Sequence, residues 1–368
     1  MPTEQSPDLS HWLPELLRVP GISGHETRVR AWLAERWAPF AHEVLTTPLG
    51  SLVARRYGHG PEPRPRLLLA AHMDTIGFVV AHVDSAGLMA IAAVGGLDLR
   101  LLPNQAVHLW PPGRATPLYG VLRAWPRGFV PEVAADQPLP LDALRIETGL
   151  TPQQVQRGVP LGTAVTFAQT PRFLGPDFIA GPGLDNRASV AALTLVLMDL
   201  AKRAHAWDVD IVATVQEETT MAGAATAAYR LRPTVAVAVD VTFAHGPGVA
   251  EHQGFPLGEG VVLGQGANIH PKIYAALRAT AQEEDIPHHT EYLPMHSGTD
   301  AAALQVAREG VPTGLVSIPL RYMHTPVEMV ALADIRRAAR LLATWAARLT
   351  PDFAAGLTVW EDDLPGGQ

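Results

Sequence analysis

The 368-residue sequence contains no cysteine. Disulfides, thiolate metal ligands and a cysteine nucleophile are therefore excluded, so any catalysis has to use oxygen and imidazole groups. Basic residues are also few, with 28 Lys and Arg against 36 Asp and Glu, a net charge of −8 and no long basic run. A partner with a phosphate backbone needs a basic surface, and we therefore expect no nucleic-acid partner.

Long apolar runs are missing as well. No 18 apolar residues follow one another, and the N-terminus does not join a basic segment to an apolar one. We expect a cytoplasmic protein without a membrane partner. Residues 264–266 read Gly-Gln-Gly but lack the P-loop lysine, and no Gly-x-Ser-x-Gly is present, so neither a nucleotide site nor a serine hydrolase is predicted.

What the sequence does contain suits a globular protein rich in turns: 47% hydrophobic residues, 32 Gly and 33 Pro. Its length exceeds that of a usual single core, which predicts two domains or one domain with a large insertion. Residues 8–38 have helical spacing interrupted at 20–24, which predicts two helices joined by a turn. Residues 75–166 are rich in Val, Gly and Pro in short alternating runs without helical periodicity, which predicts a small inserted β domain.

From residue 185 onward strand-like and helix-like segments alternate, which is typical of βαβ units around a mostly parallel sheet. The expected strands are 209–216, 235–239 and 313–318. The expected helices are 188–204, 221–231, 273–284, 300–309 and 332–349. The fold class predicted from this pattern is α/β, with helices flanking the sheet and a small inserted β domain.

Residues that can bind metal or transfer protons follow the apolar runs. Residues 67–71 lead into His72, 211–216 into Glu217 and Glu218, and 235–239 into Asp240. Open α/β sheets bind their ligands at the carboxyl ends of the strands. Two further candidates are expected at the same edge: Asp185, which opens a helix, and His324, which follows the strand 313–318.

Two His and three carboxylates without a thiolate form a ligand set expected of hydrolytic zinc, cobalt or manganese, and an Asp can bridge two such ions. Glu217 and Glu218 are adjacent and point in different directions, so one can bind metal while the other takes a proton from water and passes it to a leaving amine. Asp74 could accept the ring N–H of His72 and fix its tautomer.

Seven segments resemble the tetrahedral aminopeptidase family, which includes glutamyl, leucyl and deblocking aminopeptidases and is a branch of the co-catalytic zinc exopeptidases. Their order covers nearly the whole chain. They are Pro20-Gly-Ile-Ser-Gly-His-Glu26, His72-Met-Asp-Thr-Ile-Gly-Phe78, Gly183-Leu-Asp-Asn-Arg187, Val215-Gln-Glu-Glu218, Asp240-Val-Thr242, Gly298-Thr-Asp-Ala301 and Arg321-Tyr-Met-His-Thr-Pro326.

The resemblance implies a metal-dependent aminopeptidase that uses two divalent ions per subunit, with zinc favoured and cobalt or manganese as alternatives. It implies that His72 and Asp240 bind one ion, that Glu218 and His324 bind the other, and that Asp185 bridges them. Glu217 becomes the general base.

The same resemblance implies a zinc-exopeptidase-like catalytic domain formed by residues 1–75 and 168–368, and a β-barrel dimerisation domain formed by residues 76–167. Dimers would assemble into a hollow tetrahedral dodecamer that admits peptides. Two residues depart from the family pattern: Asn186 stands where a second Asp is usual, and Thr75 where Glu is usual. Relatives have a cis peptide after the bridging Asp, so we predict one between Asp185 and Asn186.

Two other functions remain open at this point. An endoglucanase-type hydrolase would also use acidic residues, but it needs two carboxyl groups facing each other across the glycosidic bond. A non-catalytic peptide-binding homologue would have no use for a carboxylate beside an open metal position. Which N-terminal residue is removed is left open by the sequence.

Overall fold

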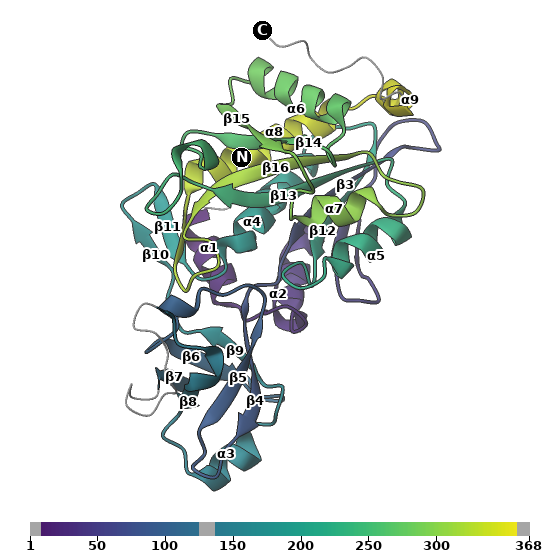
Figure 1. Ribbon diagram of the computed structural model, residues 1–368. Helices are drawn as coiled ribbons and strands as arrows, with labels where there is room; N and C mark the ends of the chain where they lie inside the picture. The colour runs from purple at the N-terminus through teal and green to yellow at the C-terminus, as the bar shows by residue number, and fades with distance from the viewer. Residues whose placement is uncertain (1–8, 125–136, 359–368) are drawn as a thin grey trace.

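Two sheets with separate hydrophobic cores make up the chain (Figure 1). The computed structural model describes residues 9–124 and 137–358. One sheet is large and mixed and carries helices on both faces, and the other closes into a small barrel below it in the view. The α/β class with an inserted barrel is therefore confirmed.

The large sheet has the strand order β1-β2-β12-β3-β13-β16-β17-β11-β10, with β14 beside β16 and β15 at the outer edge of β14. The central strands β12, β3, β13 and β16 are parallel, whereas the flanking pairs are mostly antiparallel. Its strands are β1 (Glu43–Thr46), β2 (Leu52–Arg56), β3 (Arg66–His72), β10 (Arg172–Leu174), β11 (Phe178–Gly181), β12 (Asp208–Thr214), β13 (Val235–Phe243), β14 (Val261–Gly266), β15 (His288–Leu293), β16 (Thr313–Arg321) and β17 (Glu328–Ala331).

The apolar runs of the sequence form the parallel centre of this sheet because helices cover both of its faces. β12 and β13 are buried almost throughout, as expected of strands without a solvent-facing side. The helices α4 and α8 pack on each other, and so do α5 and α7. The α-helices of this part are α1 (Leu9–Arg18), α2 (Thr27–Trp37), α4 (Leu184–Leu200), α5 (Ala222–Leu231), α6 (Pro271–Glu283), α7 (Asp300–Gln305), α8 (Leu332–Arg348) and α9 (Pro351–Ala355).

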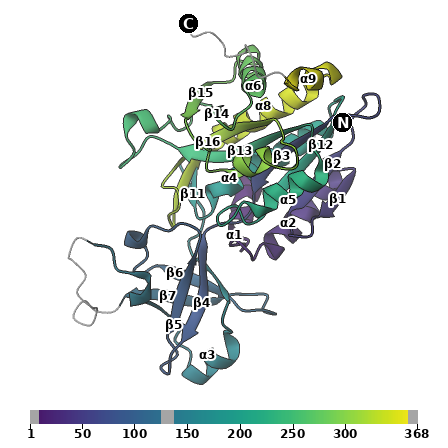
Figure 2. The ribbon, with the colours of Figure 1, turned by 45° about the vertical axis from the view of Figure 1, so that its right-hand side comes forward.

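The barrel lies between β3 and β10 in the chain and has the closed order β4-β5-β8-β7-β6-β9. Its core is formed by side chains such as Phe78, Leu109 and Ile146 and is separate from the core of the large sheet. Figure 2 shows its strands extending away from the large sheet. They are β4 (Gly77–Val83), β5 (Met89–Val94), β6 (Ala106–Trp110), β7 (Leu118–Ala124), β8 (Leu144–Glu147) and β9 (Ala164–Phe167).

The expected elements are present, but several differ in extent and one helix was not expected. A helix, α3 (Pro152–Gly158), stands in the segment for which only strands were expected, and a capping box of Thr151 and Gln154 begins it. β13 continues past Asp240, because Val241 to Phe243 still pair with β16. α7 is shorter than expected and ends at Gln305. Within the described residues, no helix has the length and apolar character needed to cross a membrane.

Candidate metal centre

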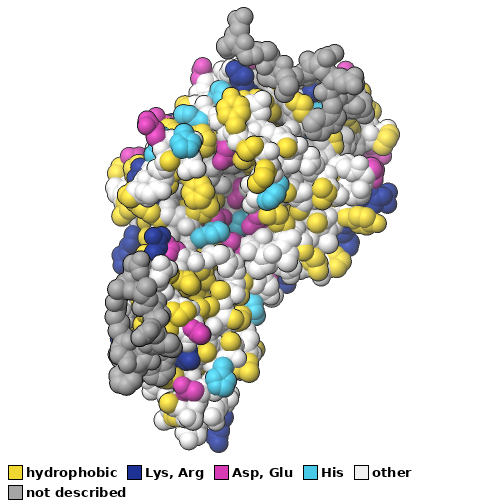
Figure 3. Space-filling view, in the orientation of Figure 1, with side chains coloured by type: hydrophobic (Ala, Val, Ile, Leu, Met, Phe, Trp, Pro, Cys, Tyr) yellow, Lys and Arg dark blue, Asp and Glu magenta, His cyan; other side chains and the backbone are white. Residues whose placement is uncertain are grey.

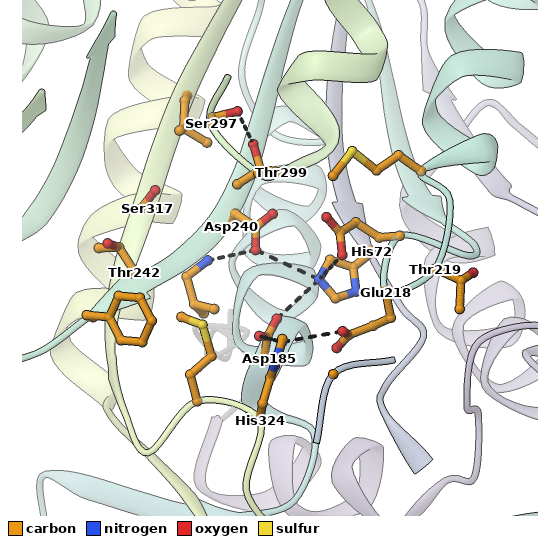
Figure 4. A pocket seen from close by; sticks show the side chains of 18 of the residues that line it. His72, Asp185, Glu218, Thr219, Asp240, Thr242, Ser297, Thr299, Ser317 and His324 are labelled. Carbon is orange, nitrogen blue, oxygen red and sulfur yellow. Dashed lines mark hydrogen bonds and ion pairs between the residues drawn. The ribbon is translucent and has the colours of Figure 1, made fainter. Parts of the chain in front are cut away.

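The structure brings the five predicted ligands together at the carboxyl edge of the parallel strands. His72 is the last residue of β3, and Asp240 lies in the neighbouring strand β13. Asp185 is in the first turn of α4, whereas Glu218 and His324 lie in the loops after β12 and β16. Their side chains point toward one another (Figure 4).

These residues form two groups whose ligand atoms are close enough to hold a metal ion, and Asp185 belongs to both. In the first group, His72 Nε2 lies 3.2 Å from Asp185 Oδ1 and 3.8 Å from Asp240 Oδ1. In the second group, His324 Nε2 lies 3.4 Å from Asp185 Oδ2 and 3.4 Å from Glu218 Oε2. The two oxygens of the Asp185 carboxylate therefore face different groups.

Glu217 lies beside the first group, with its Oε2 atom 3.7 Å from His72 Nε2, and its side chain lines the cavity described below. It has no contact with His324 of the kind that Glu218 makes within the described residues. The two adjacent glutamates thus face different ligand groups: Glu217 lies beside His72 and Glu218 beside His324. This is the geometry expected of neighbouring residues at a strand end.

Asp74 differs from its predicted role. The Nδ1 atom of His72 contacts the backbone oxygen of Asp74 at 3.1 Å, whereas the Asp74 carboxylate is 3.7 Å away. That carboxylate instead accepts the backbone N–H groups of Glu217 and Glu218, at 3.1 and 3.2 Å. The backbone oxygen of Asp74 therefore faces the His72 ring, while its side chain faces the loop of Glu217 and Glu218.

Glu328, at the start of β17, was not predicted as a site residue. It is 1% exposed, and its carboxylate accepts the N–H of Asp185 and the N–H of His324, each at 3.0 Å. It therefore fixes the backbone of two candidate ligands at once. The pairing of Gly181 with Glu328 places it there, and no periodicity in the sequence could have revealed that pairing.

The segment Pro20-Gly-Ile-Ser-Gly-His-Glu26 contacts the loop that carries Glu217 and Glu218. This loop, residues 215–221 between β12 and α5, is called the glutamate loop below. Glu26 accepts the N–H of Gln216 at 3.1 Å, and the hydroxyl of Ser23 lies 3.0 Å from that of Thr219. Thr75 pairs with this segment, because its N–H donates to Gly21 O at 3.0 Å. The predicted turn therefore also positions the residues on either side of Glu217 and Glu218.

The predicted cis peptide between Asp185 and Asn186 is confirmed. Asn186 is fully buried, and its Nδ2 atom donates to the carbonyl oxygen of Val239 at 2.9 Å. An ionised Asp could not donate this bond. The amide at this position therefore supplies a donor that an ionised Asp would lack and adds no charge beside Asp185, while its Oδ1 atom is buried without a hydrogen-bond partner among the described residues.

The electrostatics of the groups favour bound cations. Burial raises the pKa of Glu218 to about 10, and the Asp185 charge adds to the rise. Burial likewise raises the pKa of Glu217 and of Asp240. Burial lowers the pKa of His72, but the charge of Glu217, the hydrogen bond to Asp185 and the charge of Asp240 outweigh that effect and hold the pKa well above its usual value.

Divalent cations compete with protons for buried carboxylates and imidazoles, so metal binding to such a group releases protons. The Oε1 atom of Glu218 is buried and has no hydrogen-bond partner. His nitrogens and carboxylate oxygens at one edge, with an orphaned buried oxygen among them, are a donor set suited to two zinc-like ions. The residues present therefore fit the two divalent metal ions that the sequence pattern predicts.

A cavity of about 540 Å³ opens beside these residues. Figure 3 shows acidic and histidine side chains gathered in a hollow of the molecular surface above the barrel. The barrel contributes Gly96 to the lining, and a Cβ atom there would lie 3.1 Å from His324 Nδ1, a tight contact that would press on the His324 ring. The remaining walls come from the glutamate loop, β13, β15, the loop before α7 and β16.

The chain is similar to known proteins over most of its length. The sequence model of the M42 glutamyl aminopeptidase family matches residues 50–341. The lysyl aminopeptidase of Pyrococcus furiosus is 32% identical over 347 residues, which are 93% of this chain and 98% of that protein.

Solved structures are similar over nearly the whole chain. An aminopeptidase from the archaeon Desulfurococcus kamchatkensis has a TM-score of 0.86 at 30% identity, covering 94% of this chain and 96% of that one. The TET1 peptidase of Pyrococcus horikoshii, described as able to assemble into a tetrahedron or a large octahedral shell, has a TM-score of 0.80 at 26% identity, covering 93% and 100%.

Proposed function

Because the chain belongs to the M42 glutamyl aminopeptidase family, we propose that it removes N-terminal residues from peptides with two divalent metal ions and Glu217 as general base. The observation that carries the proposal is the pair of ligand groups sharing Asp185, with Glu217 beside them at the cavity. His72 and Asp240 would hold one ion and Glu218 and His324 the other, with Asp185 between them.

Bound divalent cations supply Lewis acidity, which polarises a peptide carbonyl and makes water more acidic. The carboxylate of Glu217 accepts a proton from the attacking water and delivers it to the nitrogen of the departing peptide. Burial raises the pKa of Glu217, which makes its carboxylate a better proton acceptor than that of an exposed glutamate. Asp74 holds Glu217 and Glu218 in place through their backbone N–H groups.

A panel of aminoacyl p-nitroanilides and short peptides tests this function on protein loaded with zinc, cobalt or manganese. We expect release of the N-terminal residue and no cleavage of the same peptides after N-acetylation. If no metal supports release from any substrate, the proposal is wrong.

The variant Glu217→Gln separates the enzyme from a non-catalytic peptide-binding homologue. Its metal content, measured by inductively coupled plasma mass spectrometry, should equal that of the wild type, while turnover should fall by about 100-fold or more. Unchanged turnover would remove Glu217 from the mechanism. Cellulose hydrolysis that persists in a chelator would instead favour the endoglucanase-type alternative.

We also propose that the chain self-associates through the barrel into dimers and that dimers form a dodecamer. The support is the similarity to a peptidase described as forming closed shells. Analytical ultracentrifugation should give a particle of twelve times the 39.4 kDa of one chain. A monomer at micromolar concentration would contradict this assembly.

A further inference from the structure

One acidic side chain of the cavity takes no part in the metal centre. Five acids line the cavity, and four of them are the residues already described: Asp185, Glu217, Glu218 and Asp240. The fifth is Glu291, which lies in β15 and is half-buried. Its presence needs an explanation because burying a carboxylate costs free energy unless a partner compensates the charge.

The position of Glu291 follows from the sheet. Its Oε1 atom accepts a hydrogen bond of 2.9 Å from the hydroxyl of Thr242, which belongs to β13. Thr242 lies two residues beyond Asp240 on the same strand, so both side chains point to the same face, about 7 Å apart along the strand. The hydrogen bond to Thr242 therefore places the Glu291 carboxylate beside a strand position two residues beyond the candidate ligand Asp240.

Among the residues that the structure describes, none with a basic side chain pairs with Glu291. The described residues that line the cavity include no Lys or Arg, and its walls near β13 and β16 carry the apolar side chains Phe243, Leu315 and Met323. A cavity that combines apolar wall residues with a carboxylate set apart from the metal ligands matches a side chain with an aliphatic stem and a cationic head.

We propose that Glu291 selects a basic residue, Lys or Arg, at the N-terminus of the peptide. The inference rests on the proposed aminopeptidase function, which places the scissile bond at the metal centre. The aliphatic stem then lies along the apolar wall, and its ammonium or guanidinium group pairs with Glu291 beside Thr242. Acidic N-terminal residues are rejected, because a like charge would meet Glu291 in a partly buried site.

The experiment compares lysyl and norleucyl p-nitroanilides, because norleucine has an apolar stem like that of lysine without the charged head. We expect kcat/KM of the wild type to favour the lysyl substrate by about tenfold or more, as for hydrogen bonds to a charged group. Glu291→Gln should reduce the lysyl-to-norleucyl ratio to about one. Glu291→Asp should retain part of the preference, and Glu291→Lys should shift it toward a glutamyl substrate.

Glu251→Gln is the matched control, because it removes the same charge from an exposed site outside the cavity and should leave the ratio unchanged. An equal loss on both substrates in Glu291→Gln would assign Glu291 to the peptide's α-amine and overturn the proposal. A wild type that cleaves norleucyl as well as lysyl substrates would overturn it without any variant. Absence of all aminopeptidase activity would instead contradict the proposed function itself.

Discussion

The two ligand groups share Asp185 but differ in how the fold holds them. In the first, His72 and Asp240 lie in neighbouring strands of the parallel sheet, and the His72 side chain is 2% exposed. In the second, Glu218 and His324 lie in loops, and the His324 side chain is 39% exposed. His324 also has a φ of +60°, a backbone conformation that few non-glycine residues adopt.

The difference shows two ways of positioning a ligand. Strand positions are fixed by the hydrogen bonds of the sheet, whereas loop positions need other partners for their backbone N–H groups. Asp74 and Glu328 provide such partners, because their carboxylates accept the N–H groups of Glu218 and His324. We therefore expect the first group to be the more rigid and the second to exchange its ion more readily.

Asp185→Asn is the strongest test of the shared ligand. Both groups lose a charged ligand in this variant, so both ions should bind more weakly, and kcat/KM should fall by about 1000-fold or more because Lewis acidity contributes several kcal/mol. Metal content and kinetics measure the outcome. Asp177→Asn, in an exposed turn, is the control. Loss of one ion alone would show that Asp185 serves a single group.

Removal of metal by a chelator should proceed in two steps. The ion at the second group should leave first, because solvent and chelator reach His324 more easily than His72. Metal content followed against time in EDTA measures the two steps. We expect His324→Ala to remove the fast step and His72→Ala to remove the slow step, while a single step in the wild type would contradict the difference between the groups.

Local patterns in the sequence were enough to predict that the strand-end residues of the candidate site lie at one edge of the sheet. His72 and Asp240 follow apolar runs, and such runs form the buried centre of a parallel sheet. The helix α3 was missed although Thr151 and Gln154 form a capping box that the sequence displays. The capping box predicts the start of a helix, but the sequence on either side of it has the short alternating runs that are typical of strands.

Glu328 and Glu291 could not be found from local patterns. Each reaches the site through strand pairing between segments far apart in the chain: β11 with β17, and β14 with both β15 and β16. In the sequence both are single acids without helical or strand periodicity around them. They therefore cannot be told apart from ordinary solvent-exposed acids. Only the register of the sheet distinguishes a buried supporting carboxylate from an exposed one.

Glu328→Gln tests how far metal binding at the second group depends on the hydrogen bonds that the Glu328 carboxylate accepts from the backbone N–H groups of Asp185 and His324. A glutamine keeps one acceptor, but its NH₂ group would face the other N–H donor, so one of the two bonds is lost. Loss of such supporting partners typically costs 10- to 100-fold in metal affinity. We expect that loss mainly at the second group, as measured by two-site titration of the metal-free protein.

The control for this variant is Glu259→Gln, which changes an exposed acid of the same size. Its metal affinities should match those of the wild type. Equal weakening at both groups in Glu328→Gln would place the effect on Asp185 rather than on His324, and the contrast between the groups would then be smaller than their exposure suggests.

The smallest expected effect concerns Asp300, which is 2% exposed and lies behind the first group. Burial raises the pKa of Asp300 to about 7, and repulsion from Glu217 adds to the rise, while the hydroxyl of Thr214 donates to one carboxylate oxygen. The folded protein therefore binds a proton at Asp300 between about pH 4 and pH 7, where the unfolded chain has lost it.

A group whose folded pKa is raised in this way makes the free energy of unfolding fall as pH increases through that window. Asp300→Asn is neutral throughout and keeps an acceptor for Thr214, so its free energy of unfolding should fall less, by about 1–2 kcal/mol between pH 5 and pH 7. Urea denaturation of the metal-free proteins measures the difference. Equal pH dependence in the two proteins would mean that Asp300 is already ionised at pH 5, and that the interior behind the first group is more polar than its burial implies.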